Sequence, residues 1–131
     1  MPNQEINPWE RYTSVFKALS DITRLKIMWL LLSVDSKINA SEITYVLGEN
    51  QYNVSKHMKI LKAADLIYEK KEGQWVFYHY RTSDDNFHEI VRQTVMTIPN
   101  ELMVDEKRRC KERLSMRANK ELITDTKNSK R

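Results

Sequence analysis

The chain has 131 residues, of which 40% are hydrophobic and 31% are charged, a composition typical of one globular domain. The formal net charge is +4, but its distribution is uneven. Residues 105–131 carry ten Lys and Arg against five Asp and Glu, which leaves twelve basic and thirteen acidic side chains in residues 1–104. Overall basicity therefore does not indicate nucleic-acid binding by itself, and a local pattern has to do so.

Missing sequence features exclude several classes of protein. The first ten residues lack the basic start and apolar run of a signal peptide, and the longest apolar run, residues 27–32, is too short to cross a bilayer. We therefore expect a cytoplasmic protein with no membrane partner. The single cysteine, Cys110, cannot form an internal disulfide or a thiolate metal site within one chain. Glycine-rich phosphate loops and the common hydrolase motifs are absent, so no enzyme is predicted.

Two helices are predicted at the N-terminal end. Residues 9–17 carry apolar side chains at helical spacing. Asp21 supplies the N-cap of a second helix over residues 22–32. That helix is too apolar for the surface and is assigned to the core, Ile22 included. Residues 35–39 are predicted to form a loop.

The next two segments have the pattern of a helix-turn-helix. Residues 40–47 (ASEITYVL) carry a short apolar stripe, and Gly48 ends this helix as a C-terminal cap. A second helix begins at about residue 51 and runs to about Ala64. Two short helices joined by a glycine-containing turn of three or four residues form a helix-turn-helix.

After Asp65 the apolar period changes from 3.6 to 2. Residues 66–71 (LIYEKK) and 74–80 (QWVFYHY) are two apolar, aromatic or β-branched runs joined around Gly73, which predicts a β-hairpin. A hairpin directly after a helix-turn-helix is the wing of a winged helix. The predicted fold is therefore mainly α, a winged helix-turn-helix with a two-stranded β-hairpin wing and long N- and C-terminal helices.

The C-terminal part is predicted to be helical with one break. A long helix follows Asp84 or Asp85 as its N-cap, and Pro99 kinks or restarts it. We divide the chain into a winged-helix DNA-binding and dimerisation domain, residues 1–104, and a basic, polar helical extension with a disordered end, residues 105–131.

The helix over residues 51–62 has an apolar back and a cationic front. Val54, Met58 and Leu61 recur on one face, whereas the lysines lie elsewhere and no acidic residue within the helix balances them. A recognition helix needs this division, because its back packs on the domain while its front meets base edges and phosphates in the major groove.

An ordinary solvated lysine face is the alternative interpretation of this helix. The order of a glycine turn, an acid-free helix and a hairpin wing favours DNA binding instead. The predicted DNA-binding residues are Gln51, Tyr52, Asn53, Ser55, Lys56 and Lys59 in the helix, and Lys70, Lys71 and Gln74 in the wing.

Three segments resemble the ArsR/SmtB family of winged-helix regulators: FKALSDITRLKIMWLL, ASEITYVLGENQYNVSKHMKILKAADLI and KKEGQWVFYHY. Together they cover about residues 15–81. The string VSKHMKILKAADLI is similar to the family's Ser-x-His-Leu-x-x-Leu pattern, with Met58 in the leucine position. Asp65 stands where the family usually has glycine, so strain is expected at the end of this helix.

The resemblance implies a transcriptional regulator that binds double-stranded DNA sequence-specifically, as a homodimeric repressor on an inverted repeat. It also implies that helices at both ends of the domain join the two subunits. The apolar face of residues 87–102 agrees, because a symmetric partner would cover it. The predicted dimer-interface residues are Trp9, Tyr12, Phe16, Phe87, Ile90, Val91, Val95 and Ile98.

The metal-sensor motifs of this family are missing. The arsenic or cadmium type has Cys-x-Cys in the helix before the recognition helix, where this chain has no cysteine. The zinc type has Asp-x-His and a second His eleven residues later, positions that hold Asn86 and Thr97 here. His88 lies one turn from Asp84 or Asp85 and could ligate a metal together with residues of the other subunit. None of the histidines has the fixed ligand spacing of a metal site, so a capping or solvated His88 is the favoured interpretation. We therefore predict no metal site and no cofactor.

The signal that the protein senses is left open by the sequence. One option is a small organic effector between the dimer helices, near Trp9, Tyr12, Phe87, Met96 and Met103. A redox trigger at Cys110 and the absence of any ligand are the others. A winged-helix protein-interaction module without sequence-specific DNA binding is the alternative function.

Overall fold

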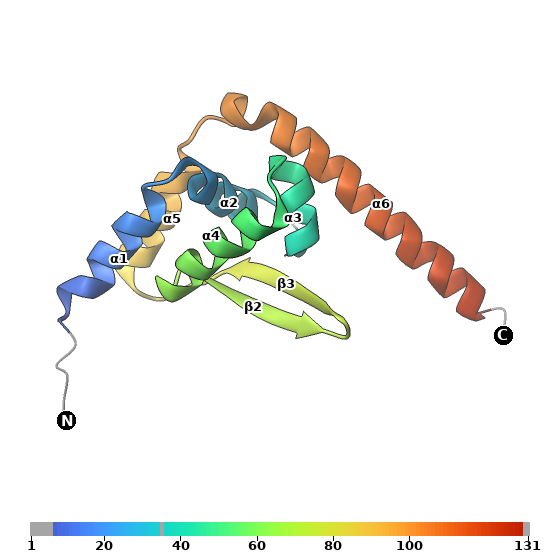
Figure 1. The fold of residues 1–131 in the computed structure, drawn as a ribbon, viewed down its shortest axis with the longest axis horizontal. Coiled ribbons are helices and arrows are strands. Elements are labelled where there is room, and N and C mark those ends of the chain that lie inside the picture. Colours follow the sequence, from blue (N-terminus) through green and yellow to red (C-terminus); the bar gives the residue numbers. More distant parts are fainter. Residues whose placement is uncertain (1–6, 35, 130–131) are drawn as a thin grey trace.

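Six α-helices and a small antiparallel sheet make up the residues that the computed structural model describes, 7–34 and 36–129, with side chains described as far as residue 120 (Figure 1). In chain order the elements are α1 (Trp9–Leu19), α2 (Ile22–Ser33), β1 (Ile38–Asn39), α3 (Ala40–Leu47), α4 (Gln51–Ala63), β2 (Ile67–Glu72), β3 (Trp75–Tyr80), α5 (Asn86–Met96), the 3₁₀ helix η1 (Asn100–Met103) and α6 (Val104–Ser129). The predicted winged helix-turn-helix fold is confirmed.

Helix α2 forms the centre of the core. Its N-cap is Asp21, whose carboxylate accepts a hydrogen bond from the Arg24 backbone N–H at 3.0 Å, and this bond lowers the pKa of Asp21. The side chains from Ile27 to Leu30 are buried. Ile22 is 74% exposed, so its assignment to the core was wrong. Ile22 is the first residue of α2, and the buried side chains of this helix begin only at Ile27.

Helices α3 and α4 are joined by a glycine turn, as predicted. Asn39 and Glu42 form a capping box at the start of α3, each side chain accepting a hydrogen bond from the other residue's backbone N–H at 2.9 Å. Gly48 has a φ of +68°, which only glycine adopts without a Cβ penalty. Asn50 then caps α4 by accepting a hydrogen bond from the Asn53 backbone N–H at 2.8 Å.

Helix α4 ends in a left-handed residue that is not glycine. Asp65 has a φ of +62°. The Asp65 N–H donates to the Lys62 carbonyl, and the Leu66 N–H donates to the Leu61 carbonyl. This pair of bonds is a Schellman motif, and the fully buried Leu61 and Leu66 supply its usual apolar contact. The strain expected at Asp65 is therefore present, because a Cβ disfavours this backbone conformation.

The wing is the predicted hairpin, with one additional strand. Strands β2 and β3 pair from Ile67 opposite Tyr80 to Glu72 opposite Trp75, and Gly73 in the turn has a φ of +63°. β1 adds to the other side of β3, which gives the strand order β1-β3-β2. The predicted loop over residues 35–39 therefore includes a strand. Its two residues are too few to show a period in the sequence.

Pro99 restarts the C-terminal helix rather than kinking it. α5 begins after Asp85, whose side chain caps it, and ends at Met96. η1 and α6 follow, and α6 passes beside α3 and leaves the domain (Figure 1). The disordered end expected at TDTKNSKR stays a prediction, and the backbone of α6 extends through Ser129. Residues 130 and 131 lie outside the described residues.

One side of α6 is packed on the domain, although its sequence reads as polar nearly all round. Cys110 is 4% exposed, and Leu114 packs against the core. Arg109 donates to the Val46 carbonyl at 2.8 Å, and Arg117 donates to the buried Glu42 carboxylate at 2.8 Å. Long arginine stems cover apolar surface while their charged ends find partners, which is why the helix docks despite its composition.

We predict that Asp65→Gly stabilises the protein by about 0.5–1 kcal/mol, because relief of the left-handed strain exceeds the extra entropy of a glycine in the unfolded chain. Asp65→Ala keeps a Cβ and should be less stable than Asp65→Gly by about 1–2 kcal/mol. Both variants lose the exposed Asp65–Arg81 ion pair equally, so this pair cancels in the comparison. Urea unfolding measures the difference, and equal stability of the two variants would contradict the strain.

Candidate nucleic-acid interface

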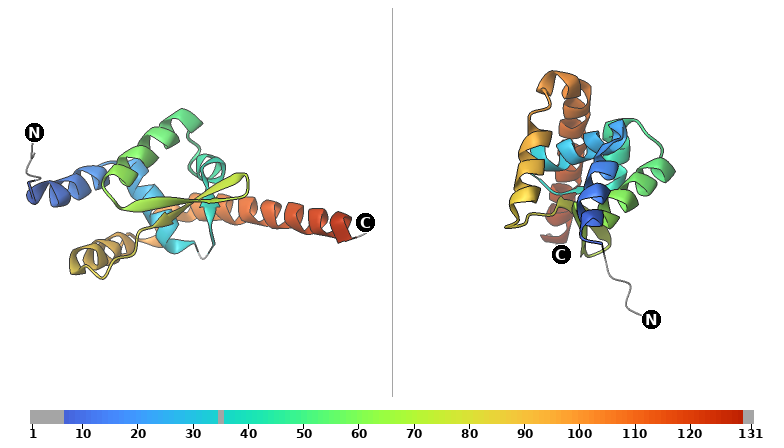
Figure 2. Two further views of the ribbon diagram at one scale, coloured as in Figure 1. Left: turned by 90° about the horizontal axis from the view of Figure 1, so that it is seen from below. Right: turned by 90° about the vertical axis from the view of Figure 1, so that its left-hand side faces the viewer.

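The front of α4 is free, and its back is fixed in the core. Val54 and Leu61 are fully buried and Met58 is 3% exposed, which confirms the predicted back. Both views of Figure 2 place α4 at the edge of the molecule, on the opposite side of α2 from α5. The predicted contact residues on this helix are exposed or half-exposed: Gln51, Tyr52, Asn53, Ser55, Lys56 and Lys59. We use "the front of α4" for these six residues.

A polar contact fixes α4 against the junction of α1 and α2. The half-buried His57 has its Nδ1 3.1 Å from an Arg24 nitrogen and 3.7 Å from an Asp21 oxygen. Arg24 in turn donates to the Ala18 carbonyl at 2.6 Å. His57 therefore packs α4 against this junction, and the contact sets the orientation of the front of α4.

Charge on the front of α4 is not balanced within the helix. Among the described residues, neither Lys56 nor Lys59 lies in an ion pair. Lys62, nearer the C-terminal end, is different, because Glu69 of the wing binds it and thereby raises its pKa. One acidic residue comes close from outside the helix: Glu49 accepts a hydrogen bond from the Asn53 side-chain amide at 3.3 Å.

The two predicted wing lysines point to opposite faces of the sheet. Lys71 lies two residues after Glu69 in β2, so the two side chains share one face of the sheet. Glu69 binds Lys62 of α4, which places Lys71 on the α4 side. Lys70 lies opposite Phe77, whose ring is covered by Lys37 and Arg117 on the other side. The exposed Gln74 stands in the turn between the strands. Of the two predicted wing lysines, only Lys71 therefore lies on the side of the sheet that meets α4.

Helices α1 and α5 share an aromatic cluster at the predicted dimer surface. Phe87 packs edge-on against Tyr12 and Phe16, with ring centroids 4.8 Å and 5.9 Å apart. Exposure is largest at Trp9 (73%), Phe16 (62%) and Ile90 (51%). The other predicted interface residues are less accessible: Tyr12, Phe87 and Ile98 are half-buried, while Val91 and Val95 lie in the chain's own core.

The histidines contact other side chains of this chain. Within residues 7–34 and 36–129, no group of three or more His, Cys, Asp or Glu side chains is placed to hold a metal ion. His88 is 4% exposed, and its Nδ1 lies 3.1 Å from Asp85 Oδ2 and 3.2 Å from an Arg11 nitrogen. His79 stacks on Tyr68 with ring centroids 5.2 Å apart. Both rings therefore serve packing and polar contacts between neighbouring elements.

Burial limits access to two candidate signal sites, the thiol of Cys110 and the suggested effector pocket between the dimer helices. Burial raises the pKa of the Cys110 thiol, which reduces the thiolate fraction that oxidation requires. Met103, one of the residues suggested for an effector pocket, is only 2% exposed and belongs to the core.

In the part of the chain that the structure describes, no helix is both long and apolar enough for a membrane span.

Comparisons with known proteins agree with this geometry. The family described as "Helix-turn-helix domain" matches residues 19–68. The chain is 36% identical over 84 residues to an uncharacterized HTH-type transcriptional regulator of Methanocaldococcus jannaschii, covering 64% of this chain and 91% of that protein. It is 37% identical over 70 residues to the transcriptional repressor SdpR of Bacillus subtilis, covering 53% and 76%. The match to the arsenical resistance operon repressor of Escherichia coli is 38% identical and covers 53% and 56%.

Solved structures show the same fold. HlyU from Vibrio cholerae is 26% identical, with a TM-score of 0.54 over 64% of this chain and 90% of HlyU. A homodimeric winged helix-turn-helix DNA-binding domain from Mycobacterium bovis is 21% identical, with a TM-score of 0.57 over 80% of this chain and 93% of that domain. At this identity the second likeness concerns the fold alone.

Proposed function

The chain belongs to the ArsR/SmtB family of winged-helix transcriptional regulators, and from this premise we propose that it is a homodimeric repressor of an inverted repeat in double-stranded DNA. DNA binding as a regulator is the common property of this family. The observation that carries the proposal is the division of α4 into a buried back and a free front with unpaired lysines. DNA as the partner also implies a cytoplasmic location.

The front of α4 has the chemistry of a major-groove reader. The groove is about 12 Å wide and admits one helix. The Gln51 and Asn53 amides suit bidentate contact with adenine, while Lys56 and Lys59 lie further along the helix, where phosphates flank the groove. Glu49 holds the Asn53 amide in the free protein. In the complex, this amide has to turn from Glu49 to a base.

The wing extends the contact to the neighbouring backbone. Lys71 shares the side of the sheet that faces α4, so it can reach the same duplex as the front of α4. Gln74 at the turn is exposed and can bond to a phosphate or sugar. Lys70 faces the side on which Arg117 and Lys37 cover Phe77, and we now assign it no DNA contact.

The exposed side chains of α1 and α5 supply the dimer contact. Trp9, Phe16 and Ile90 expose more than half of their surface, and a symmetric partner would bury them. The related Mycobacterium bovis domain is described as homodimeric. Two copies of α4 would then enter successive major grooves about 34–36 Å apart, one turn of the duplex.

A protein partner on the same surface is less well supported. Protein interfaces are depleted in lysine and concentrate aromatic and other apolar residues at their centre. The front of α4 offers one large exposed aromatic, Tyr52, among amides, a hydroxyl and two lysines. A polyanion matches this composition better than a protein does.

We predict that Lys56→Ala with Lys59→Ala weakens binding to all duplexes and reduces the salt dependence. Each lost lysine–phosphate contact makes the negative slope of log K against log salt shallower by about 0.9. The double substitution removes four such lysines from a dimer, so the slope should become shallower by about 3–4. Filter-binding titrations on random duplex DNA across salt concentrations measure this slope.

Arg108→Ala is the matched control, because it removes one exposed positive charge from α6 without touching α4. It should leave the slope within experimental error of the wild type. A wild-type slope near zero would contradict DNA binding itself and favour the protein-interaction alternative. An unchanged slope in the double lysine variant would contradict the assigned contacts.

The two wing lysines should differ, although they are adjacent in sequence. We expect Lys71→Ala to make the negative salt slope of a dimer shallower by about 2, because each subunit then neutralises one phosphate fewer. Lys70→Ala should leave the slope unchanged, since this side chain faces away from α4. The same titrations compare the two variants. Equal decreases in slope would show that the wing meets DNA edge-on, in a different orientation from the one proposed.

A further inference from the structure

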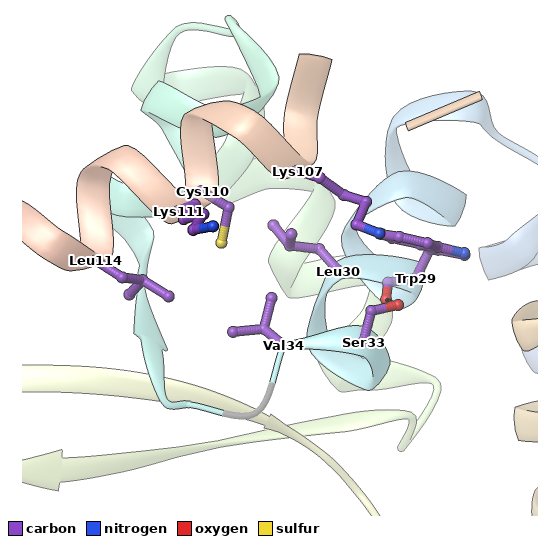
Figure 3. Close-up of a pocket in the computed structure, with 8 residues that line it drawn as sticks. All are labelled: Trp29, Leu30, Ser33, Val34, Lys107, Cys110, Lys111 and Leu114. Atoms are coloured by element: carbon purple, nitrogen blue, oxygen red, sulfur yellow. Dashed lines mark hydrogen bonds between the residues drawn. The ribbon is translucent and has the colours of Figure 1, made fainter. Parts of the chain in front are cut away.

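A cavity of about 270 Å³ opens between α2 and α6 (Figure 3). Trp29 and Leu30 of α2 and Val34, the residue after α2, line one side, and Cys110 and Leu114 of α6 line the other. In Figure 3 the Leu30, Val34 and Leu114 side chains and the Cys110 sulfur point toward the space between the two helices. These walls are therefore apolar, and α6, which the sequence presents as a polar tail, supplies two of the five residues.

Positive charge accompanies these apolar walls. Lys107 and Lys111 line the same cavity from α6. Neither ammonium group lies in an ion pair with any described carboxylate, because the acidic residues of this stretch, Asp105, Glu106 and Glu112, pair with other cations. An apolar cavity with two unbalanced cations favours a ligand with an apolar body and one negative charge.

We propose that this cavity binds a small organic anion, a carboxylate with a compact apolar body, and that its occupation weakens DNA binding. The second half of this statement rests on the proposed function, and the first half does not. The apolar body packs between Leu30, Val34 and Leu114, and the carboxylate pairs with Lys107 and Lys111.

The size of the cavity limits the ligand. An apolar cavity of about 150 Å³ holds benzene, and pockets for drug-sized ligands begin at about 300 Å³. At about 270 Å³ the cavity lies between these sizes and fits one aromatic ring or a medium-length alkyl chain. Benzoate and octanoate are therefore suitable probes.

The position of the cavity connects it to the helix-turn-helix. Helix α6 holds α3 through Arg109, which donates to Val46, and through Arg117, which donates to Glu42. Helix α3 is joined to α4 by the short turn around Gly48. A ligand bound against α6 adds contacts that change the balance of these α6–α3 bonds, and a shift of α3 moves the front of α4.

The binding test uses the whole protein without DNA. Trp29 lines the cavity, so its indole N–H signal in a ¹H–¹⁵N NMR spectrum reports occupation, with Trp29→Phe identifying the signal. Titration with benzoate and octanoate should shift this signal saturably and leave those of the exposed Trp9 and Trp75 unchanged. Benzyl alcohol and octanol, which have the same bodies without the charge, should bind at least tenfold more weakly.

Two variants test the two parts of the site. Lys107→Met with Lys111→Met keeps the stems and removes the charge, and should weaken carboxylate binding at least tenfold without changing alcohol binding. Leu114→Phe fills the cavity and should abolish binding of both probes, with circular dichroism confirming the fold. No saturable shift at millimolar probe, or equal binding of acid and alcohol, would overturn the site.

A second measurement separates the site from its effect on DNA. The carboxylate that binds in the NMR titration is then added to a preformed protein–DNA complex, and it should release the DNA. The Leu114→Phe variant should keep its DNA bound in the same experiment. Carboxylate binding without any change in DNA affinity would overturn the coupling and leave the site standing. Failure of the protein to bind any duplex would overturn the proposed function and leave the NMR result intact.

Discussion

Burial of one side of α4 is the constraint on which the rest of the structure depends. Val54, Met58 and Leu61 pack into the core formed around α2, and this packing leaves the opposite side of the helix in solvent. The glycine turn before α4 and the Schellman motif after it fix where the helix begins and ends. The Arg24–His57 contact then fixes its orientation. A reading surface needs such a rigid support, because its amides have to meet base edges within hydrogen-bonding distance.

Helix α6 makes the first helix of the helix-turn-helix part of a larger unit. The Glu42 carboxylate is almost fully buried, and it accepts hydrogen bonds both from the Asn39 backbone N–H and from Arg117. One side chain therefore joins the start of α3 to a helix more than seventy residues further along the chain. The burial of Cys110 and the Arg109–Val46 bond strengthen the same contact. This arrangement gives the C-terminal segment a route to influence α4 without touching DNA.

Local patterns predicted the elements, and tertiary contacts account for what they missed. The caps at Asp21 and Asp85, the Gly48 turn and the hairpin are short-range signals, so the fold followed from the sequence. β1 did not, because two residues show no period and their partner in β3 lies almost forty residues away. The docking of α6 depends on arginine stems, which hydropathy counts as polar, and on Cys110 and Leu114, which are too few to stand out as an apolar stripe. Alternation along a strand already divides Lys70 and Lys71 between two faces, but which of them lies on the α4 side depends on how the wing packs, which the Lys62–Glu69 pair shows.

In the proposed complex, two copies of α4 read successive major grooves on one side of a duplex. Selection from a random duplex library, using the purified wild-type protein, tests it most directly. The selected sequences should be inverted repeats with half-site centres about 10–10.5 base pairs apart, and selection with Asn53→Ala should relax one position in each half-site. Enrichment of no sequence, or of sites without two-fold symmetry, would contradict the claim.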